Sequence, residues 1–399
     1  MNKSFEPISY LTAFAATFAL LWVLRSLAPR IGLVDQPAGH RHHEHATPLV
    51  GGLAMFCGFL FAVLALPTPL SSFRPFFVGA ALLVIVGVLD DMHELSSRAR
   101  FAAQIVASLL MIYWGGVVLT DLGYLMTENL FTLGRYSVPL TVFATVGVIN
   151  ALNMSDGMDG LAGSLALVGF TFIALSAAAA GQGDVVGVVV LLMIVVAAFL
   201  LFNLRLPWRP RALLFMGDAG SMFLGFALTW LFVALSQGEG RSLLPVTALW
   251  FLAVPLFDTV AMLMRRILLR RSPFQADREH VHHLLFALGM SVNRTLLLIV
   301  LCAVLLAAIG LWAQLAAVPE RYMFYAFLAL FGLYFVGSWI AWTRLGGQAG
   351  VEARRPPPAF VERRRGPADR RRDERRKGVD RRSGHADRRK HGSGAQDQL

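Results

Sequence analysis

Charged residues and cysteines are both scarce in this chain of 399 residues. Asp, Glu, Lys and Arg make up only 15% of the sequence, against 56% hydrophobic residues, and the apolar residues come in long blocks instead of amphipathic stripes. This composition argues against a soluble globular protein and is typical of a polytopic membrane protein. The only cysteines, Cys57 and Cys302, lie inside apolar runs, so nothing indicates a disulfide framework or a cysteine metal site.

Also missing is any polar stretch between the apolar runs that is long enough to fold separately, so residues 1–342 are predicted to form one transmembrane domain. Because about 20 apolar residues cross the hydrocarbon of a bilayer, we predict an all-α, polytopic integral membrane protein with about eleven transmembrane helices, or ten if the shortest connections are not real. The first run lacks a strongly basic leader and a small-residue cleavage site, which favours a retained span over a signal peptide. The predicted spans start near Ile8, Leu49, Phe73, Phe101, Val138, Leu161, Val185, Phe215, Leu243, Thr295 and Tyr322.

The basic residues of the loops predict the orientation. With the amino terminus outside, fourteen arginines up to Arg294 fall in inner loops and five Lys or Arg residues fall in outer segments. Cytoplasmic loops carry the excess of Lys and Arg, so we predict the N-terminus outside and the C-terminus inside. All the polar motifs described below would then lie on the inner face.

Residues 343–399 have a different composition from the rest of the chain. From position 344 on they hold 17 of the 36 Lys and Arg residues and 8 of the 25 Asp and Glu residues, so this tail supplies +9 of the net charge of +11. It is predicted to be a disordered, basic cytoplasmic tail. Because it lacks interleaved aromatic residues that could stack on bases, we expect contact with anionic membrane lipid and no nucleic acid.

Acidic residues end several apolar runs, where ionisable groups are costly and usually mark function. Asp90 and Asp91 end the run that starts at Phe73. Adjacent helical residues point about 100° apart, so one carboxylate can face a buried site while the other faces a different partner. The alternative is a solvated helix end that carries two acids.

A second cluster contains Asn153, Asp156 and Asp159, which are spaced three residues apart and on a helix would share one face. A helix cap needs only one side-chain acceptor. Here three oxygen-bearing groups occur together with Gly157 and Gly160, which allow close backbone approach. The cluster is therefore interpreted as functional and not as a simple cap.

A third motif, Phe215-Met-Gly-Asp218-Ala-Gly-Ser, opens the next inner-face span. Glycines that flank an acid at a helix start let backbone N–H groups approach phosphate, while the carboxylate can hold a cation. The alternative interpretation is a glycine-rich helix start capped by Asp218.

Histidines are concentrated in two inner loops. His280, His282 and His283 follow Arg278 in the longest loop. Histidine pairs that bind zinc on a helix usually have i, i+4 spacing, and no cysteine is available here as a further ligand. We therefore favour imidazoles that donate hydrogen bonds to phosphate over a zinc site. The alternative is that these histidines lie in a solvated basic loop. Arg41 lies among four further histidines between positions 40 and 45, which indicates a cationic loop that guides an anionic substrate, or adventitious metal binding.

Five ordered motifs resemble the polyprenyl-phosphate N-acetylhexosamine-1-phosphate transferase family, glycosyltransferase family 4. The resemblance covers residues 30–290, and the His-Val-His-His sequence looks like the GlcNAc-1-phosphate branch, because MraY-type enzymes usually have three consecutive histidines there. One departure is the histidine-rich loop before Pro48, where relatives often have more Lys and Arg. The motifs are Pro48-Leu-Val-Gly-Gly, Asp90-Asp91, Asn153-Met-Ser-Asp-Gly-Met-Asp-Gly-Leu, Phe215-Met-Gly-Asp-Ala-Gly-Ser and His280-Val-His-His.

The resemblance implies an enzyme that transfers GlcNAc-1-phosphate, or a related N-acetylhexosamine-1-phosphate, from a UDP-sugar to undecaprenyl phosphate and releases UMP. Such a reaction is the first membrane step of cell-envelope polysaccharide synthesis, including lipopolysaccharide and O-antigen, at the cytoplasmic face of the bacterial inner membrane. Two phosphorylated substrates meet there, so Mg²⁺, with Mn²⁺ as the alternative, and fixed cations are expected to offset their negative charge.

The family also implies roles for individual residues. We expect Asn153 and Asp218 to be direct metal ligands, because Mg²⁺ prefers few protein oxygens and keeps substrate phosphate oxygens in its shell, and Asp156 to support that shell. Asp90 or Asp91 is expected to act on the polyprenyl phosphate. The remaining substrate-binding residues are expected to be Asp159 and Phe215 near the uridine, Arg278, His280, His282 and His283 at the pyrophosphate, and Arg41 in the guiding loop.

The sequence leaves two mechanisms and two further classes of protein open. Direct attack by the lipid phosphate is favoured over a covalent intermediate on an Asp, because the second pKa of a phosphate monoester is about 6 and the acceptor is mostly dianionic at neutral pH. A polytopic transporter of an anionic solute is the main alternative class. It predicts polar groups at span midpoints and repeated halves, whereas the acids cluster at inner ends and no internal repeat is visible. A non-catalytic membrane anchor leaves the acids unexplained.

Overall fold

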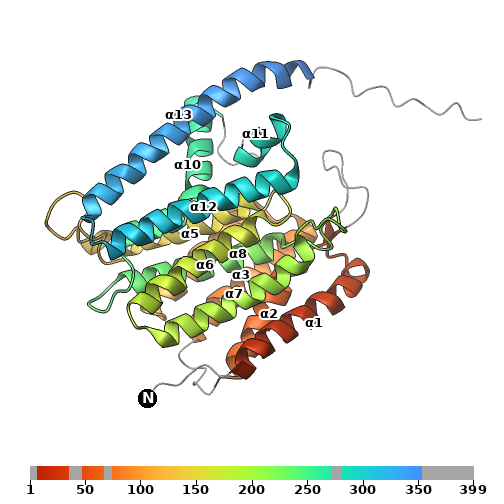
Figure 1. Cartoon of the computed structure of the whole chain (residues 1–399). Helices are drawn as coiled ribbons and strands as arrows, with labels where there is room; N and C mark the ends of the chain where they lie inside the picture. The colour runs from red at the N-terminus through yellow and green to blue at the C-terminus, as the bar shows by residue number, and fades with distance from the viewer. Residues whose placement is uncertain (1–6, 36–46, 67–73, 272–279, 353–399) are drawn as a thin grey trace, which may run out of the picture. The chain divides into compact units, whose positions relative to one another are not determined.

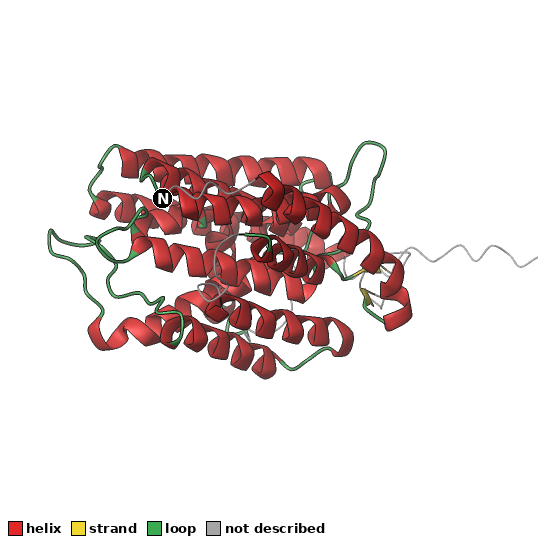
Figure 2. Cartoon of the chain, turned by 90° about the horizontal axis from the view of Figure 1, so that it is seen from below, coloured by secondary structure: helices red, strands yellow, loops and turns green. Residues whose placement is uncertain are grey.

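The structure, a computed structural model, describes residues 7–35, 47–66, 74–271 and 280–352. Most of these residues are helical (Figure 2), and within them the only strands, β1 (Val34–Asp35) and β2 (Thr47–Pro48), form one short antiparallel pair. The predicted all-α class is confirmed. The helices are α1 (Pro7–Ile31), α2 (Gly51–Leu64), α3 (Arg74–His93), α4 (Ser97–Tyr113), the 3₁₀ turn η2 (Gly134–Tyr136), α5 (Ser137–Ser155), α6 (Leu161–Ala179), α7 (Gly183–Asn203), α8 (Gly217–Ser236), α9 (Pro245–Phe251), α10 (Ala253–Leu268), α11 (Val281–Ala287), α12 (Val292–Leu315) and α13 (Glu320–Glu352).

Many helices of the described part are suited to a membrane. Eight of them, α1, α3, α5, α6, α7, α8, α12 and α13, are long and apolar enough to cross a bilayer, and α9 with α10 forms a ninth candidate. α2 and α4 are shorter, with 14 and 17 residues. A polytopic helical membrane protein is therefore confirmed, whereas the number of eleven spans and the orientation of the termini stay predictions.

The ninth candidate span is broken, because α9 and α10 meet at an angle of 82°. Pro255 lies in the first turn of α10. A continuous helix would need an N–H donor at this position, which proline lacks, but proline is tolerated in the first turn of a new helix. The chain accordingly starts α10 in a new direction, and Figure 1 shows it running across the neighbouring helices.

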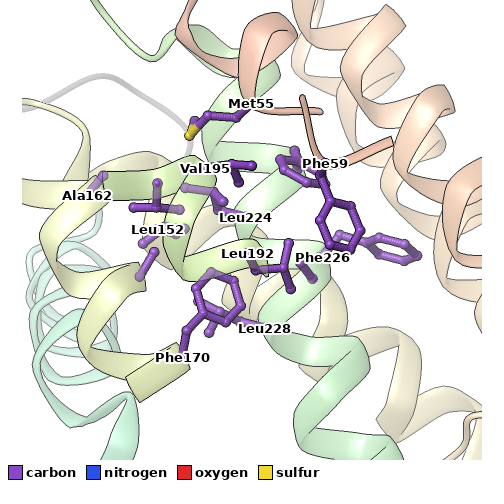
Figure 3. Close-up of a cluster of buried hydrophobic side chains, with 14 of the residues drawn as sticks. Met55, Phe59, Leu152, Ala162, Phe170, Leu192, Val195, Leu224, Phe226 and Leu228 are labelled. Carbon is purple, nitrogen blue, oxygen red and sulfur yellow. The ribbon is translucent and has the colours of Figure 1, made fainter. Parts of the chain in front are cut away.

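α8 forms the centre of the bundle. It packs against α2, α3, α5, α6 and α9, and almost all of its residues are buried. A helix that is apolar on every side is stable only when other helices surround it. Figure 3 shows this packing, with Met55 of α2, Phe170 of α6 and Leu192 of α7 around Leu224 and Phe226 of α8. The surrounding helices thus fix the position of α8, including its first turn.

Four helix ends meet at one end of this bundle. The carboxyl ends of α3 and α5 lie beside the amino ends of α4 and α8, and hydrogen bonds to their side chains join all four. Internal contacts divide the chain after Trp342, and α13 continues to Glu352, past the predicted start of the tail. The predicted sites at Arg41 and Arg278 and the tail from residue 353 on lie outside the described residues.

Candidate active site

Asp90 and Asp91 lie in the last turn of α3 and have different partners, as their adjacent positions on a helix predict. The Asp90 carboxylate is buried. It accepts a hydrogen bond from the backbone N–H of Leu95 at 2.6 Å and another from Nη1 of Arg100 at 2.9 Å. Asp91 accepts from the backbone N–H of Asp218 at 2.9 Å. Asp90 is thus held by the loop and the start of α4, and Asp91 by the start of α8.

Asp218 stands in the first turn of α8, as predicted, and Gly217 before it has a φ of +72°. A Cβ atom at Gly217 would collide with the Asp91 carboxylate, so only glycine permits this approach of α3 to α8. Asn153 of α5 donates from Nδ2 to Oδ1 of Asp218 at 2.6 Å, and Arg100 donates to the other carboxylate oxygen at 3.4 Å. Asp90, Asp91, Asn153 and Asp218 therefore form one cluster.

The expectation that Asn153, Asp156 and Asp159 share one face of a helix is wrong. α5 ends at Ser155, and Asp156 and Asp159 lie in the turn between α5 and α6. Gly160 is the N-cap of α6 and has a left-handed backbone conformation, with φ +82°. A continuous helix has no left-handed residue, so α5 does not continue into α6. Only Asn153 is helical, and the two acids project from a loop.

Asp159 is fixed by the segment that follows α7. Nε of Arg205 donates to its carboxylate at 2.6 Å, and the backbone N–H of Ala212 donates at 3.3 Å. Asn203, the last residue of α7, accepts from the Gly160 N–H at 2.7 Å and donates to the Leu214 carbonyl at 2.9 Å. The buried Asn203 side chain therefore ties the Asp159 turn to the segment that leads into α8.

Asp156 is only partly buried but lies close to several other carboxylates. Loss of hydration raises the pKa of its carboxyl well above the ordinary value, and the negative charges of Asp218, Asp91 and Asp159 raise it further. A cation near this group would lower the same electrostatic cost. The turn after α5 is therefore a strongly electronegative position.

The histidine motif is partly helical instead of forming a loop. His280 caps the short helix α11, and His282 and His283 lie in its first turn. Nδ1 of His280 lies 2.8 Å from Oδ2 of the buried Asp258 in α10. The other Asp258 oxygen accepts from the Val281 N–H at 2.8 Å and from the Tyr334 hydroxyl of α13 at 2.9 Å. One carboxylate thus fixes the start of α11 against α10 and α13.

His282 connects this motif to the acidic turn. Its ring is almost fully buried. Nε2 packs so closely against Gly157 that a Cβ atom at this glycine would lie only 2.8 Å from it. Burial, with smaller contributions from His283 and His280, lowers the pKa of His282 to about 3. His282 is therefore neutral at physiological pH, and its buried Nε2 beside the Asp156 turn has no hydrogen-bond partner among the described residues.

The oxygen-rich cluster fits a magnesium ion. Asp91 Oδ2 is buried and has no hydrogen-bond partner among the described residues, and the side chains around Asp218 offer carboxylate and amide oxygens. Within the described ranges, no three His, Cys, Asp or Glu side chains converge closely enough to enclose a metal. Mg²⁺ needs no such protein cage, because one or two carboxylates and substrate phosphates usually hold it.

Several residues of the site were not predicted as functional. Arg100 served only to predict the orientation, although it follows Asp90 by ten residues and reaches two carboxylates. Asp258 could have been found, because an acid inside the apolar run of α10 is unusual. Asn203 and Arg205 gave no comparable signal. Of the predicted residues, Phe215 also joins two segments through its backbone: its N–H donates to the Pro48 carbonyl at 2.8 Å, and its carbonyl accepts from the Gly51 N–H at 3.0 Å.

Comparison with known proteins gives consistent matches. The profile described as glycosyl transferase family 4 matches residues 73–236. The chain is 38% identical over 335 residues to the undecaprenyl-phosphate alpha-N-acetylglucosaminyl 1-phosphate transferase of Yersinia pestis, covering 84% of this chain and 92% of that protein. Proteins with the same name match from Escherichia coli (strain K12), at 36% identity over 84% of this chain and 91% of the relative, and from Haemophilus influenzae, at 38% identity over 84% and 94%.

Proposed function

The chain belongs to glycosyl transferase family 4, and on that premise we propose that it transfers N-acetylglucosamine 1-phosphate from a UDP-sugar to undecaprenyl phosphate and releases UMP. The supporting observation is the similarity, over more than four-fifths of the chain, to relatives that carry the name of this activity. It favours a transferase over the transporter considered from the sequence. The cluster of carboxylates and Arg100 at one end of a membrane bundle suits a reaction between two anionic substrates.

Phosphotransferases of this family generally depend on a divalent metal, and we propose Mg²⁺, with Mn²⁺ as the alternative. Asn153 and Asp218 would hold it and Asp156 would support them, since these side chains supply the oxygen atoms that Mg²⁺ prefers. When bound, the metal would offset the negative charge of the pyrophosphate and of the leaving UMP. Asn153 Nδ2 donates to Asp218 Oδ1 at 2.6 Å, so the two proposed ligands lie side by side.

Asp90, Asp91 and Arg100 are proposed to position the acceptor. Arg100 contacts both Asp90 and Asp218, and a guanidinium has five N–H donors in a planar fork that matches phosphate. It can therefore hold a phosphate oxygen of the lipid while Asp90 fixes its direction. Asp91 would keep the start of α8 in place through the Asp218 N–H.

The sugar nucleotide is proposed to occupy the turn between α5 and α6 and the segment before α8. Asp159 and Phe215 would contact the uridine, and His280, His282 and His283 would donate to the pyrophosphate. Because His282 is neutral, it can donate only one hydrogen bond. Arg278 and Arg41 keep their proposed roles at the pyrophosphate and in the guiding loop, outside the described residues.

Direct attack by the lipid phosphate is the proposed mechanism. The phosphate dianion is already nucleophilic at neutral pH, and each carboxylate of α3 accepts at least one hydrogen bond that orients it. The oxygen of the acceptor would bond to the phosphorus that carries the sugar as the bond to the UMP oxygen breaks. A radiolabelled sugar phosphate trapped covalently on the protein would contradict this route.

For the location, we propose the bacterial inner membrane with the site on the cytoplasmic face, eleven spans, the N-terminus outside and the C-terminus inside. The excess of arginines in the inner loops supports this orientation. The proposed organisation is a transferase domain over residues 1–342 and a basic cytoplasmic tail over 343–399, whose charge of +9 favours anionic lipid. The product would enter cell-envelope polysaccharide synthesis.

The proposed activity can be tested with membranes that contain the protein, undecaprenyl phosphate and a series of UDP-N-acetylhexosamines, with and without Mg²⁺. We expect metal-dependent UMP release with UDP-N-acetylglucosamine. Asp218→Asn should abolish most of it, whereas Asp184→Asn, an exposed acid in the first turn of α7, is the matched control and should not. Absence of metal-dependent UMP with every donor would refute the proposal.

A further inference from the structure

A hydrogen bond between two amide side chains joins α4 to α5 inside the bundle. Oε1 of Gln104 in α4 accepts from Nδ2 of Asn150 in α5 at 2.7 Å, and Nε2 of Gln104 lies 3.7 Å from Sδ of Met222 in α8. The same Asn150 nitrogen donates to the Val146 carbonyl of its own helix at 2.8 Å. The Asn150 amide therefore presents N–H groups to α4, and the buried Gln104 side chain must meet them with its oxygen.

The two amides lie one helical turn from two side chains of the proposed active site. Gln104 follows Arg100 by four residues on α4. Asn150 precedes Asn153 by three residues on α5. Residues at these spacings share one face of a helix. Arg100 and Asn153 contact opposite oxygens of the Asp218 carboxylate, at 3.4 and 2.6 Å. Because one turn rises about 5.4 Å, the amides are the next layer of the bundle behind the two groups that hold Asp218.

The position of α4 beside α8 is set indirectly. α4 packs chiefly against α3 and α5, whereas α5 packs closely along α8. The Arg100 guanidinium therefore reaches Asp218 from a helix whose position depends on these neighbours. A slide of α4 along α5 would leave the buried Gln104 oxygen without its donor, which costs free energy. The hydrogen bond to Asn150 thus opposes such a slide, and with it a displacement of Arg100 from Asp218.

This hydrogen bond is better suited to fixing a position than to adding stability. Hydrogen bonds between membrane helices contribute only modestly to stability, and apolar side chains of similar volume would pack without the cost of burying two amides. A guanidinium that clamps a phosphate must be placed accurately, because a displacement of about 1 Å can lower a rate about a hundredfold. Accurate placement of Arg100 is a role that the amide pair fits.

We propose that Gln104 is a positioning residue. Its hydrogen bond to Asn150 fixes α4 against α5 and thereby holds the Arg100 guanidinium where it can bind the phosphate of the lipid acceptor. Gln104 itself does not touch the substrate. The inference rests on the proposed function, in which Arg100 holds the acceptor phosphate, and it predicts that loss of the hydrogen bond weakens use of the acceptor more than use of the sugar nucleotide.

Two measurements on the full-length protein in detergent test this role. They are binding of undecaprenyl phosphate by native mass spectrometry, and the kinetics of UMP release with each substrate varied in turn. Gln104→Met keeps the length of the side chain but removes the acceptor oxygen. We expect binding of undecaprenyl phosphate, and kcat/KM for it, to fall about tenfold, while the KM for UDP-N-acetylglucosamine changes by less than about twofold. A side chain that only stabilised the fold would affect both substrates alike.

Ser108→Ala is the matched control. Ser108 is buried one turn further along α4, and its hydroxyl donates to the backbone carbonyl of Gln104 at 2.7 Å, within the same helix. The substitution removes a buried polar group from α4 without removing a hydrogen bond between helices. This variant should bind undecaprenyl phosphate and release UMP like the unmodified protein.

An exchange of the two amides provides a second variant if Gln104→Met does not fold. Gln104→Asn draws the oxygen back and should weaken binding of undecaprenyl phosphate about tenfold, and the addition of Asn150→Gln should restore binding to within about threefold. Unchanged binding by a folded Gln104→Met variant would overturn the role of Gln104, as would equal losses for both substrates or an exchange that restores nothing. If the unmodified protein binds undecaprenyl phosphate but releases no UMP, the transferase activity is refuted, and the binding comparison still decides the role of Gln104.

Discussion

Asp258 offers the sharpest test of how the fold supports the proposed active site. Its carboxylate is 6% exposed and accepts from His280, from the Val281 N–H and from the Tyr334 hydroxyl, all within 2.9 Å. The contact between Nδ1 of His280 and Asp258 fixes the orientation of the imidazole ring and thus of its other nitrogen, Nε2.

Asp258→Asn changes this hydrogen-bond pattern while keeping the size of the side chain. The amide oxygen can still accept from Val281 or Tyr334, but the amide that faces Nδ1 of His280 no longer carries the negative charge of the carboxylate, so the contact that orients the ring is weakened. Loss of one hydrogen bond to a charged group costs about 1.5–3 kcal/mol. If the interaction acts fully in the transition state, kcat/KM falls about 10- to 150-fold.

The assay is UMP release as a function of pH, with the single and double variants of Asp258 and His280. In a His280→Gln background, Asp258→Asn should add less than about a twofold loss, because residues that act through one another are not additive. Tyr334→Phe leaves the pair of Asp258 and His280 intact and should cost about threefold or less. A full additional loss in the His280→Gln background would refute the positioning role of Asp258.

Three further predictions concern the same region. Asn203→Ala should lower the free energy of unfolding by about 1–3 kcal/mol, because it leaves the Gly160 N–H and the Leu214 carbonyl unpaired; an unchanged thermal midpoint in detergent would contradict this. Burial lowers the pKa of His282 to about 3, so below about pH 6.5 the unfolded chain binds a proton that the folded protein does not. The protein should therefore lose stability as the pH falls from about 6.5 toward 3. In the His282→Gln variant the melting temperature should depend less on pH over this range. EDTA should abolish UMP release and Mg²⁺ should restore it. Asn153→Ala should raise the Mg²⁺ concentration at half-maximal rate by about tenfold. If this Mg²⁺ concentration is unchanged in the variant, Asn153 is not a ligand.

The sequence predicted the helices better than it predicted their ends. Long apolar runs specify membrane helices whatever their neighbours are, and an acid at the end of a run, such as Asp91 or Asp218, has few other places to lie than a helix terminus. The turn after Ser155 was missed, because three-residue spacing suits a helix as well as a loop. The deciding feature there is the left-handed conformation of Gly160, which a sequence permits but does not require.

The contacts between helices that are distant in the sequence could not be predicted either. They depend on glycines that let two helix backbones come very close together. A Cβ atom at Gly52 of α2 would collide with the backbone of Gly220 in α8, and one at Gly87 of α3 would collide with the backbone of Ala219. Small residues allow such backbone contact between membrane helices, but each glycine has many candidate partners along the chain. Only the packed bundle selects these pairs. Because both contacts lie directly after Asp218 in the first turn of α8, the close approach of α2 and α3 to this turn is what brings the acids of α3 within hydrogen-bond distance of Asp218.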